Sequence, residues 1–195
     1  MVDYSFSNVV ILILQGYWYF IPLFISNPTA TFTANSRPMD FGRSFSDGKR
    51  ILGDGKSWGG LIGGTMFGLL VGLVLALVVD MAGMAHVWQW GDSSAEIIVV
   101  VFLISFGALF GDALGSFIKR RLDIGRGRKA PGLDQYDMIA GVIILLLVFR
   151  TGWFMDHFIR DGHWIGLLGV IILTPVIHRV ANIIGYKIGV KQVPW

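Results

Sequence analysis

Three acidic residues in the second half of the sequence have the side chains and the spacing needed to hold a metal ion against phosphates. Asp112 lies within an apolar stretch, and Asp134 and Asp137 follow Pro131 at a mutual spacing of three residues. Carboxylate oxygens suit Mg²⁺, which keeps some of its waters and takes further oxygens from a nucleotide. Asp134 and Asp137 could equally well be the cap and the first-turn acid of a helix, which needs no further function. The residues alone leave both interpretations open.

A helix that continues beyond Asp112 would place Ser116 and Lys119 on the same face, four and seven residues later, with Arg120 directly after them. A carboxylate near the centre of a membrane span costs about 2.5–3.5 kcal/mol, so Asp112 is expected to have a metal ion or a basic side chain beside it. A purely structural ion pair with Arg179 is the alternative for Asp112. Arg179 could instead meet a lipid phosphate or extend to the membrane surface.

A glycine-rich segment runs from Leu52 to Gly60 and leads into the second apolar stretch. Asp54, Gly55 and Lys56 lie just before the helix start, where backbone N–H groups and the helix dipole favour an anion such as phosphate. The P-loop pattern is absent, because no G-x-x-x-x-G-K-[ST] precedes the helix. An ordinary solvated loop is the alternative for this segment.

The composition indicates what kind of structure must position these residues. The 195 residues are 54% hydrophobic and 15% charged, with a mean hydropathy of +0.65. Soluble domains carry about 25% charged residues, so the charges here are too few to cover an ordinary globular surface. Cysteine is absent, which excludes disulfides and cysteine-ligated metal sites. A soluble domain and a disordered chain are excluded, and an all-α integral membrane protein is predicted.

Five apolar stretches are long enough to cross the hydrocarbon core, because a helix of about 20 residues spans about 30 Å. One transmembrane domain over residues 1–195 is therefore predicted, with five transmembrane helices at about 6–26, 58–79, 97–117, 138–155 and 164–184. In the second helix a glycine recurs at every fourth position, which predicts a smooth face for close helix packing. These glycines are Gly60, Gly64, Gly68 and Gly72. Gly59 and Gly60 would also let a phosphate approach the backbone at the start of that helix.

Basic residues are concentrated in two of the connecting loops. Residues 27–57 contain five Lys or Arg and residues 118–137 contain six, whereas the loop after the second helix contains none. The positive-inside rule therefore places these two loops in the cytoplasm, with the N-terminus outside. The C-terminus, which carries Lys187 and Lys191, is then cytoplasmic. The two cytoplasmic loops are predicted to form the active site.

Taken together, these motifs resemble those of the archaeal CDP-archaeol synthases. The resemblance lies in Gly111-Asp112, Gly115-Ser116-Phe-Ile-Lys119-Arg120-Arg121, Arg126-Gly127, Leu133-Asp134-Gln-x-Asp137 after Pro131, and the segment from Leu52 to Gly60. It spans nearly the whole chain and includes the five-helix layout. The sequence is more distantly similar to the CDP-diacylglycerol synthases, whose serine, Lys-Arg pair and paired aspartates match in order. It departs from them in lacking a His-Gly-Gly piece and in having Gln135 where they have arginine.

The resemblance implies a membrane-embedded cytidylyltransferase. CTP and 2,3-di-O-geranylgeranylglycerol 1-phosphate would give CDP-archaeol and pyrophosphate. A phosphate whose second pKa is about 6 is largely ionised at neutral pH, so its oxygen can attack the α-phosphorus of CTP without a strong general base. The reaction then depends on charge neutralisation and on in-line placement of two anions.

The resemblance also implies roles for particular residues. Asp112, Asp134 and Asp137 would hold Mg²⁺, and together with Lys119 they form the predicted catalytic set. The predicted nucleotide-binding residues are Asp54, Gly55, Lys56, Ser116, Lys119 and Arg120. Arg179 is the candidate contact for the lipid phosphate. The expected partners are CTP, the geranylgeranyl ether lipid phosphate and the lipid bilayer, with no nucleic acid and no protein partner.

A small ion- or proton-coupled transporter that uses Asp112 and Arg179 is the alternative from a different class. No inverted repeat is evident in the sequence, and five helices do not divide into equal halves, which argues against a transporter. A CDP-alcohol phosphotransferase is a weaker alternative, because Asp47-Gly48 is not followed by the Ala-Arg of that family's motif. Release of pyrophosphate from CTP would separate an enzyme from a carrier.

Overall fold

The structure, a computed structural model, describes residues 4–125, 128 and 130–187. Its named elements are all helices, so the prediction of an all-α protein is confirmed for this part of the chain. Three basic residues that the sequence predicts on the cytoplasmic side lie outside the described residues: Arg126, Lys129 and Lys191.

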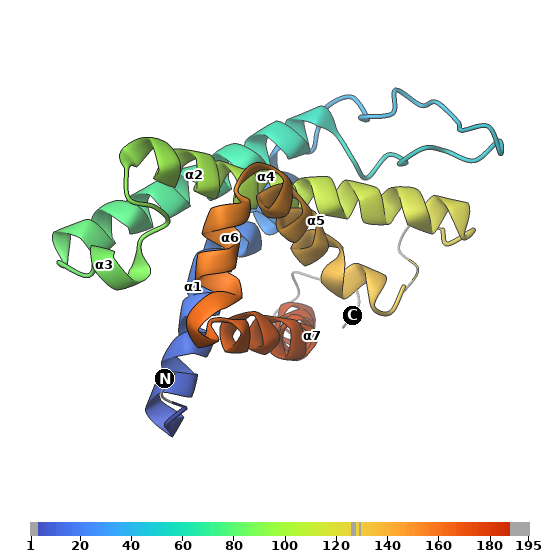
Figure 1. Cartoon of the computed structure of the whole chain (residues 1–195). Coiled ribbons are helices and arrows are strands. Elements are labelled where there is room, and N and C mark those ends of the chain that lie inside the picture. The colour runs from blue at the N-terminus through green and yellow to red at the C-terminus, as the bar shows by residue number, and fades with distance from the viewer. Residues whose placement is uncertain (1–3, 126–127, 129, 188–195) are drawn as a thin grey trace.

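The long helices α1, α2 and α4 cross one another near the centre of the molecule, and α5 to α7 pack beside them (Figure 1). The α-helices are α1 (Phe6–Ala30), α2 (Trp58–Met81), α3 (Ala85–Trp88), α4 (Ser94–Arg121), α5 (Leu133–Phe149), α6 (Thr151–Phe158) and α7 (Trp164–Lys187). Two 3-10 turns, η1 (Thr31–Thr33) and η2 (Arg160–Gly162), follow α1 and α6.

Three helical segments are long and apolar enough to cross a membrane. They are Phe6–Thr33, Trp58–Met81 and Ser94–Arg121, whereas the apolar part of α7, Trp164–Ile177, is shorter. These three segments match the first three predicted transmembrane helices, and each extends beyond its predicted bounds at one end or both.

The prediction of one helix over 138–155 is wrong, because the chain leaves helical geometry at Arg150 (φ −144°, ψ 47°). The following Thr-Gly pair favours helix weakly, so a break here costs little. The break directs α6 back toward α1, where Phe158 packs against Phe20 with ring centroids 5.2 Å apart. Burial of aromatic side chains of α6 compensates for the lost helical hydrogen bonds.

The glycine face of α2 packs against α1 and α4. Gly60, Gly64, Gly68 and Gly72 are all buried. A Cβ atom on Gly68 would lie 2.7 Å from Ser105 Oγ of α4 and 2.8 Å from the carbonyl oxygen of Pro22 in α1. A side chain larger than hydrogen would therefore separate the helices, and the predicted packing role of these glycines is confirmed.

A second glycine contact brings α4 and α5 together. A Cβ on Gly107 would lie 2.9 Å from Val142 Cα, and a Cβ on Gly141 would lie 2.5 Å from Gly111 Cα. Gly111 also lies against the carbonyl oxygen of Asp137. Because Asp112 follows Gly111 in the chain, this contact places the first turns of α5 close to Asp112.

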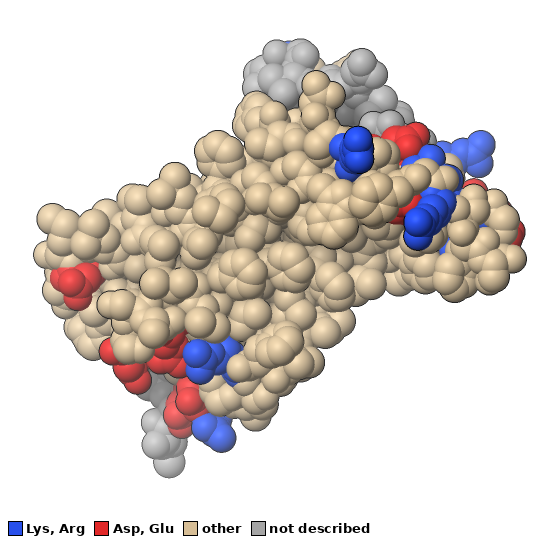
Figure 2. Space-filling view, turned by 90° about the horizontal axis from the view of Figure 1, so that it is seen from above, with Lys and Arg blue, Asp and Glu red and all other residues tan. Residues whose placement is uncertain are grey.

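The charged side chains of the molecule lie mainly at its ends. Figure 2 shows Lys, Arg, Asp and Glu gathered toward two ends of the face in view, with uncharged residues between them. The loop between α1 and α2 projects at the same end as the last turns of α4, whereas α3 lies at the other end (Figure 1). An uncharged belt between charged ends is typical of a helical membrane protein.

Candidate active site

An ion pair between Lys56 and Asp112 lies at the centre of the candidate site. Lys56 Nζ donates to Asp112 Oδ2, and the two side chains are 21% and 19% exposed. Lys56 is held by the start of α2, where Ser57 Oγ accepts a hydrogen bond from the Gly60 N–H at 3.1 Å. The basic partner expected for Asp112 is therefore present, and it is Lys56 rather than Arg179, which is exposed on α7.

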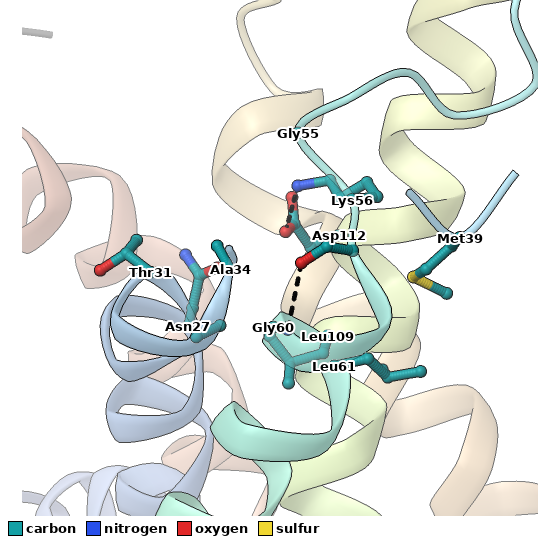
Figure 3. A pocket seen from close by; sticks show the side chains of 12 residues that line it. Asn27, Thr31, Ala34, Met39, Gly55, Lys56, Gly60, Leu61, Leu109 and Asp112 are labelled. Carbon is teal, nitrogen blue, oxygen red and sulfur yellow. Dashed lines mark hydrogen bonds and ion pairs between the residues drawn. The ribbon is translucent and has the colours of Figure 1, made fainter. Parts of the chain in front are cut away.

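A pocket opens beside this ion pair, between the cytoplasmic ends predicted for α1, α2 and α4 (Figure 3). Six of its lining residues come from three different segments: Asn27 and Thr31, Gly55 and Lys56, and Leu109 and Asp112. The contribution of α1 was missed in the sequence. The polar Asn27, followed by Pro28 near the end of the first apolar stretch, is the signal that could have indicated that α1 lines the site.

Lys119 and Asp134 form a second ion pair, which joins the end of α4 to the start of α5. Lys119 Nζ lies 2.8 Å from Asp134 Oδ1, and Asp134 Oδ2 accepts a hydrogen bond from the Ala130 N–H at 2.7 Å. Asp134 therefore stabilises the turn that begins α5, as its structural interpretation predicts, although the N-cap position itself is Gly132. Lys119 and Asp112 lie two helical turns apart on α4.

Asp137 is buried at the crossing of α4 and α5. Its residue is 8% exposed, and its Oδ1 accepts a hydrogen bond from the Met138 N–H at 2.8 Å. Within the described part of the chain, no group of three Asp, Glu, His or Cys side chains is arranged to hold one metal ion. Asp112 and Asp134 are each turned toward a lysine, so the three predicted carboxylates lie in one region without surrounding a common point.

The remaining predicted nucleotide-binding residues occupy different surroundings. Ser116 is buried within α4, and Arg120 donates to the carbonyl oxygens of Leu52 at 3.4 Å and Ile124 at 2.6 Å. Asp54 is an exposed partner of Arg50 at 2.8 Å. A second pocket contains both Asp54 and Arg120, together with Lys49, Arg50, Asp123 and Gly125. The structure thus places Lys56 and Asp54 in two different pockets, and Gly55 lines the pocket of Lys56.

Asp40 organises the loop before α2 and was missed in the sequence. Its buried carboxylate binds Arg50 through Nη2 at 2.9 Å and Nε at 3.2 Å. It also accepts hydrogen bonds from the N–H groups of Leu52 at 3.0 Å, Gly53 at 2.8 Å and Gly42 at 3.1 Å. The Arg50 guanidinium and these N–H groups hold the pKa of Asp40 well below its usual range, against the effect of burial.

Arg121 fastens the same loop to the end of α4. Its guanidinium lies 5.0 Å from the ring centroid of Phe45 and 4.8 Å from that of Phe117, a cation–π arrangement. Its Nε lies 3.0 Å from Asp47 Oδ2, and its Nη2 donates to the carbonyl oxygen of Arg50 at 2.6 Å. The loop that carries Lys56 is therefore attached to the helix that carries Asp112.

The glycines at the start of α2 serve packing in this structure. The N–H of Gly59 donates to Ser36 Oγ at 2.7 Å, and the N–H of Gly60 donates to Ser57 Oγ. A Cβ on Gly59 would collide with the carbonyl oxygen of Thr33. The N–H groups of Gly59 and Gly60, which the sequence suggested as phosphate ligands, thus donate hydrogen bonds within the protein.

Comparisons with known proteins assign the chain to a family. The family model described as CarS-like, CDP-archaeol synthase, matches residues 9–195. A CDP-archaeol synthase of Picrophilus torridus is 38% identical over 95% of this chain and 98% of its own length. One of Methanosphaerula palustris is 42% identical over 90% of this chain and 99% of its own length.

A solved structure described as an intramembrane enzyme for archaeal membrane lipid biosynthesis is also similar. Its sequence is 31% identical to this chain, and the match covers 88% of this chain and 94% of the solved chain. The two structures superpose with a TM-score of 0.66. These matches support an enzyme and not the transporter alternative. The chain belongs to the CarS-like CDP-archaeol synthase family, as its resemblance in sequence implied.

Proposed function

We propose that the protein transfers CMP from CTP to the phosphate of 2,3-di-O-geranylgeranylglycerol 1-phosphate, giving CDP-archaeol and pyrophosphate. The observation that carries this proposal is the ion pair between Lys56, just before the membrane-length helix α2, and Asp112 on the membrane-length helix α4. Lys119, also on α4, forms a second pair with Asp134. Paired cations and carboxylates at the end of an apolar helix bundle suit a reaction between one anionic lipid and one anionic nucleotide.

In this reaction an oxygen of the lipid phosphate forms a bond to the α-phosphorus of CTP, and the bond between that phosphorus and the β-phosphate oxygen breaks. The leaving group is pyrophosphate, and no proton must be removed from an ionised lipid phosphate. Lys56 would neutralise charge where the two phosphates meet, while Lys119 and Arg120 would neutralise the triphosphate. Asp54, Gly55 and Ser116 complete the proposed nucleotide-binding set.

The carboxylates suit a divalent cation such as Mg²⁺, because carboxylate oxygens are ligands that Mg²⁺ prefers and it needs only one or two of them beside substrate phosphates. Asp112 and Asp137 would hold it, and Asp134 would join them when the triphosphate draws Lys119 away. The ion would neutralise the phosphates and orient them for in-line attack.

We also propose five membrane spans, with the N-terminus outside and the active site facing the cytoplasm. The support is the concentration of Lys and Arg in the loop before α2 and at the end of α4. In this orientation Arg179 on α7 is available to lipid phosphates of the inner leaflet.

The test is a transfer assay with the purified full-length protein in nanodiscs. Labelled CTP and Mg²⁺ are supplied with a geranylgeranyl ether lipid phosphate, a saturated ether phosphate or an ester phosphate, and both CDP-lipid and pyrophosphate are quantified. Equal amounts of both products with the geranylgeranyl lipid are expected. Absence of product with all three lipids, from protein shown to be folded, would contradict the proposal.

A further inference from the structure

Two pockets are lined in part by successive segments of the loop before α2, one by residues up to Asp54 and the other by residues from Gly55, and their linings differ in chemistry. The pocket that contains Asp54 is highly charged, and its three basic residues, Lys49, Arg50 and Arg120, outnumber its two acids, Asp54 and Asp123. The pocket that contains Lys56 joins that lysine and Asp112 to several apolar side chains, among them Leu61, Leu109 and Met39. A basic and polar pocket suits a nucleotide triphosphate, whereas a pocket with charge at one end and apolar walls suits an amphipathic anion.

Asn27 faces the Lys56–Asp112 pair across the second of these pockets. Figure 3 shows the side chains of Asn27 on α1 and Thr31 at the start of η1 at one side of the pocket, with Lys56 and Asp112 at the other. Asn27 is half-buried, and among the described residues no group forms a hydrogen bond with its side-chain amide. The Thr31 hydroxyl, in contrast, donates to the Pro28 carbonyl oxygen at 2.6 Å.

A partly buried amide without a protein partner is unfavourable unless water or a ligand satisfies it. Asn27 lies near one end of the apolar segment Phe6–Thr33. A lipid whose chains stay in the hydrocarbon region beside this segment can therefore bring its phosphate to Asn27 and Lys56. A nucleotide that approaches from the loops does not need contact with α1.

From these observations, and resting on the proposed function, we infer that the pocket between α1, α2 and α4 binds the phosphoglycerol end of the acceptor lipid. Asn27 donates a hydrogen bond to the lipid's phosphate or glycerol oxygens, and Lys56 supplies the opposite charge. The nucleotide occupies the neighbouring pocket beside Arg50 and Arg120. Lys56 and Asp112 then lie at the boundary where the attacking oxygen meets the α-phosphorus.

The test compares Asn27→Ala and Asn27→Asp with the matched control Asn35→Ala, since Asn35 is exposed and lies outside the pocket lining. Each full-length variant is assayed with the geranylgeranyl lipid phosphate varied at saturating CTP, and with CTP varied at saturating lipid. Asn27→Ala is expected to raise KM for the lipid about tenfold and to leave KM for CTP within about twofold. Asn27→Asp keeps the shape of the side chain but repels the phosphate, so its lipid KM should rise further.

A second measurement needs no turnover. Binding of the lipid phosphate, and of the uncharged geranylgeranylglycerol, is measured by native mass spectrometry without CTP or divalent metal. Asn27→Asp should lose binding of the phosphate but not of the uncharged lipid. An unchanged lipid KM in both Asn27 variants, or an equal rise in KM for CTP, would overturn the pocket assignment. A wild-type protein that binds the lipid phosphate yet forms no CDP-lipid would instead overturn the proposed function alone.

Discussion

Gly115 of α4 lies directly against the carboxyl group of Asp137 on α5. A Cβ built on Gly115 would lie 2.8 Å from Asp137 Cβ and 3.0 Å from its Cγ, and closer still to Oδ2. Two sequence-distant members of the family's motif are therefore in van der Waals contact. The absence of a side chain on Gly115 leaves room for the Asp137 carboxylate. Packing against α4 at Gly115 and the hydrogen bond from the Met138 N–H fix the position of that carboxylate.

Gly115→Ala is expected to displace the Asp137 carboxylate, because neither helix backbone can move away without opening the glycine contact between α4 and α5. We expect turnover to fall by about tenfold or more, with a loss of about 1–3 kcal/mol in the free energy of unfolding. Gly152→Ala is the matched control, since a Cβ there meets nothing within 4 Å. Steady-state rates and thermal unfolding of both variants check the prediction, and wild-type activity in Gly115→Ala would contradict it.

Asp40→Asn is expected to loosen the loop before α2. Asparagine removes the charge that Arg50 meets, and it leaves fewer acceptor positions for the N–H groups of Leu52 and Gly53. Hydrogen exchange of a peptide covering 48–56 should become faster in the variant. Asp80→Asn serves as the control, because Asp80 is exposed at the far end of α2 and lies outside this loop. Equal exchange in wild type and Asp40→Asn would show that this carboxylate does not organise the loop.

The pH dependence of the same loop follows from the lowered pKa of Asp40. An unfolded aspartate has a pKa of about 3.9, so the stabilisation is complete above that pH and is lost as the pH falls through the lower folded pKa. The protection of peptide 48–56 in the wild type should therefore be constant between about pH 5 and 8, after correction for intrinsic exchange rates. A fall in protection within that range would require another titrating group.

The parts of the structure that the sequence predicted are those set by local patterns. Apolar length indicated the first three long helices, and the four-residue spacing of glycine indicated the face of α2 that meets Pro22 and Ser105. The spacing of Asp112 and Lys119 on one helix also follows from helical geometry alone. Each of these features depends on residues that are close in sequence.

What the sequence did not indicate depends on contacts between distant segments. The partner of Asp112 is Lys56, and the loop that carries this lysine is held by Arg121 and by Asp40. No periodic pattern connects these residues, because each contact arises from the way the loop folds onto α4. The break at Arg150 is of the same kind, since the packing of α6 against α1 selects it.

Lys119→Met is expected to weaken CTP binding more than lipid binding. Removal of the lysine leaves Asp134 without its partner at 2.8 Å and removes a positive charge from the proposed triphosphate site. KM for CTP should rise by about tenfold or more, and its dependence on salt concentration should become weaker. Lys187→Met, at an exposed position at the end of α7, is the charge-matched control. A larger effect on KM for the lipid would place Lys119 in the acceptor site instead.

Asp112→Asn tests the metal proposal and the ion pair together. The amide keeps the size of the side chain but binds a divalent cation less strongly and no longer neutralises Lys56, so turnover should fall by about 100-fold or more. Chelation of divalent metal should abolish wild-type turnover, and added Mg²⁺ should restore it. The variant should need a higher Mg²⁺ concentration for half-maximal rate and should unfold at a temperature close to the wild type. Asp80→Asn, which changes an exposed acid at the end of α2, controls for the loss of one negative charge. An unchanged Mg²⁺ requirement in Asp112→Asn would mean that this carboxylate is not a metal ligand and serves the ion pair alone.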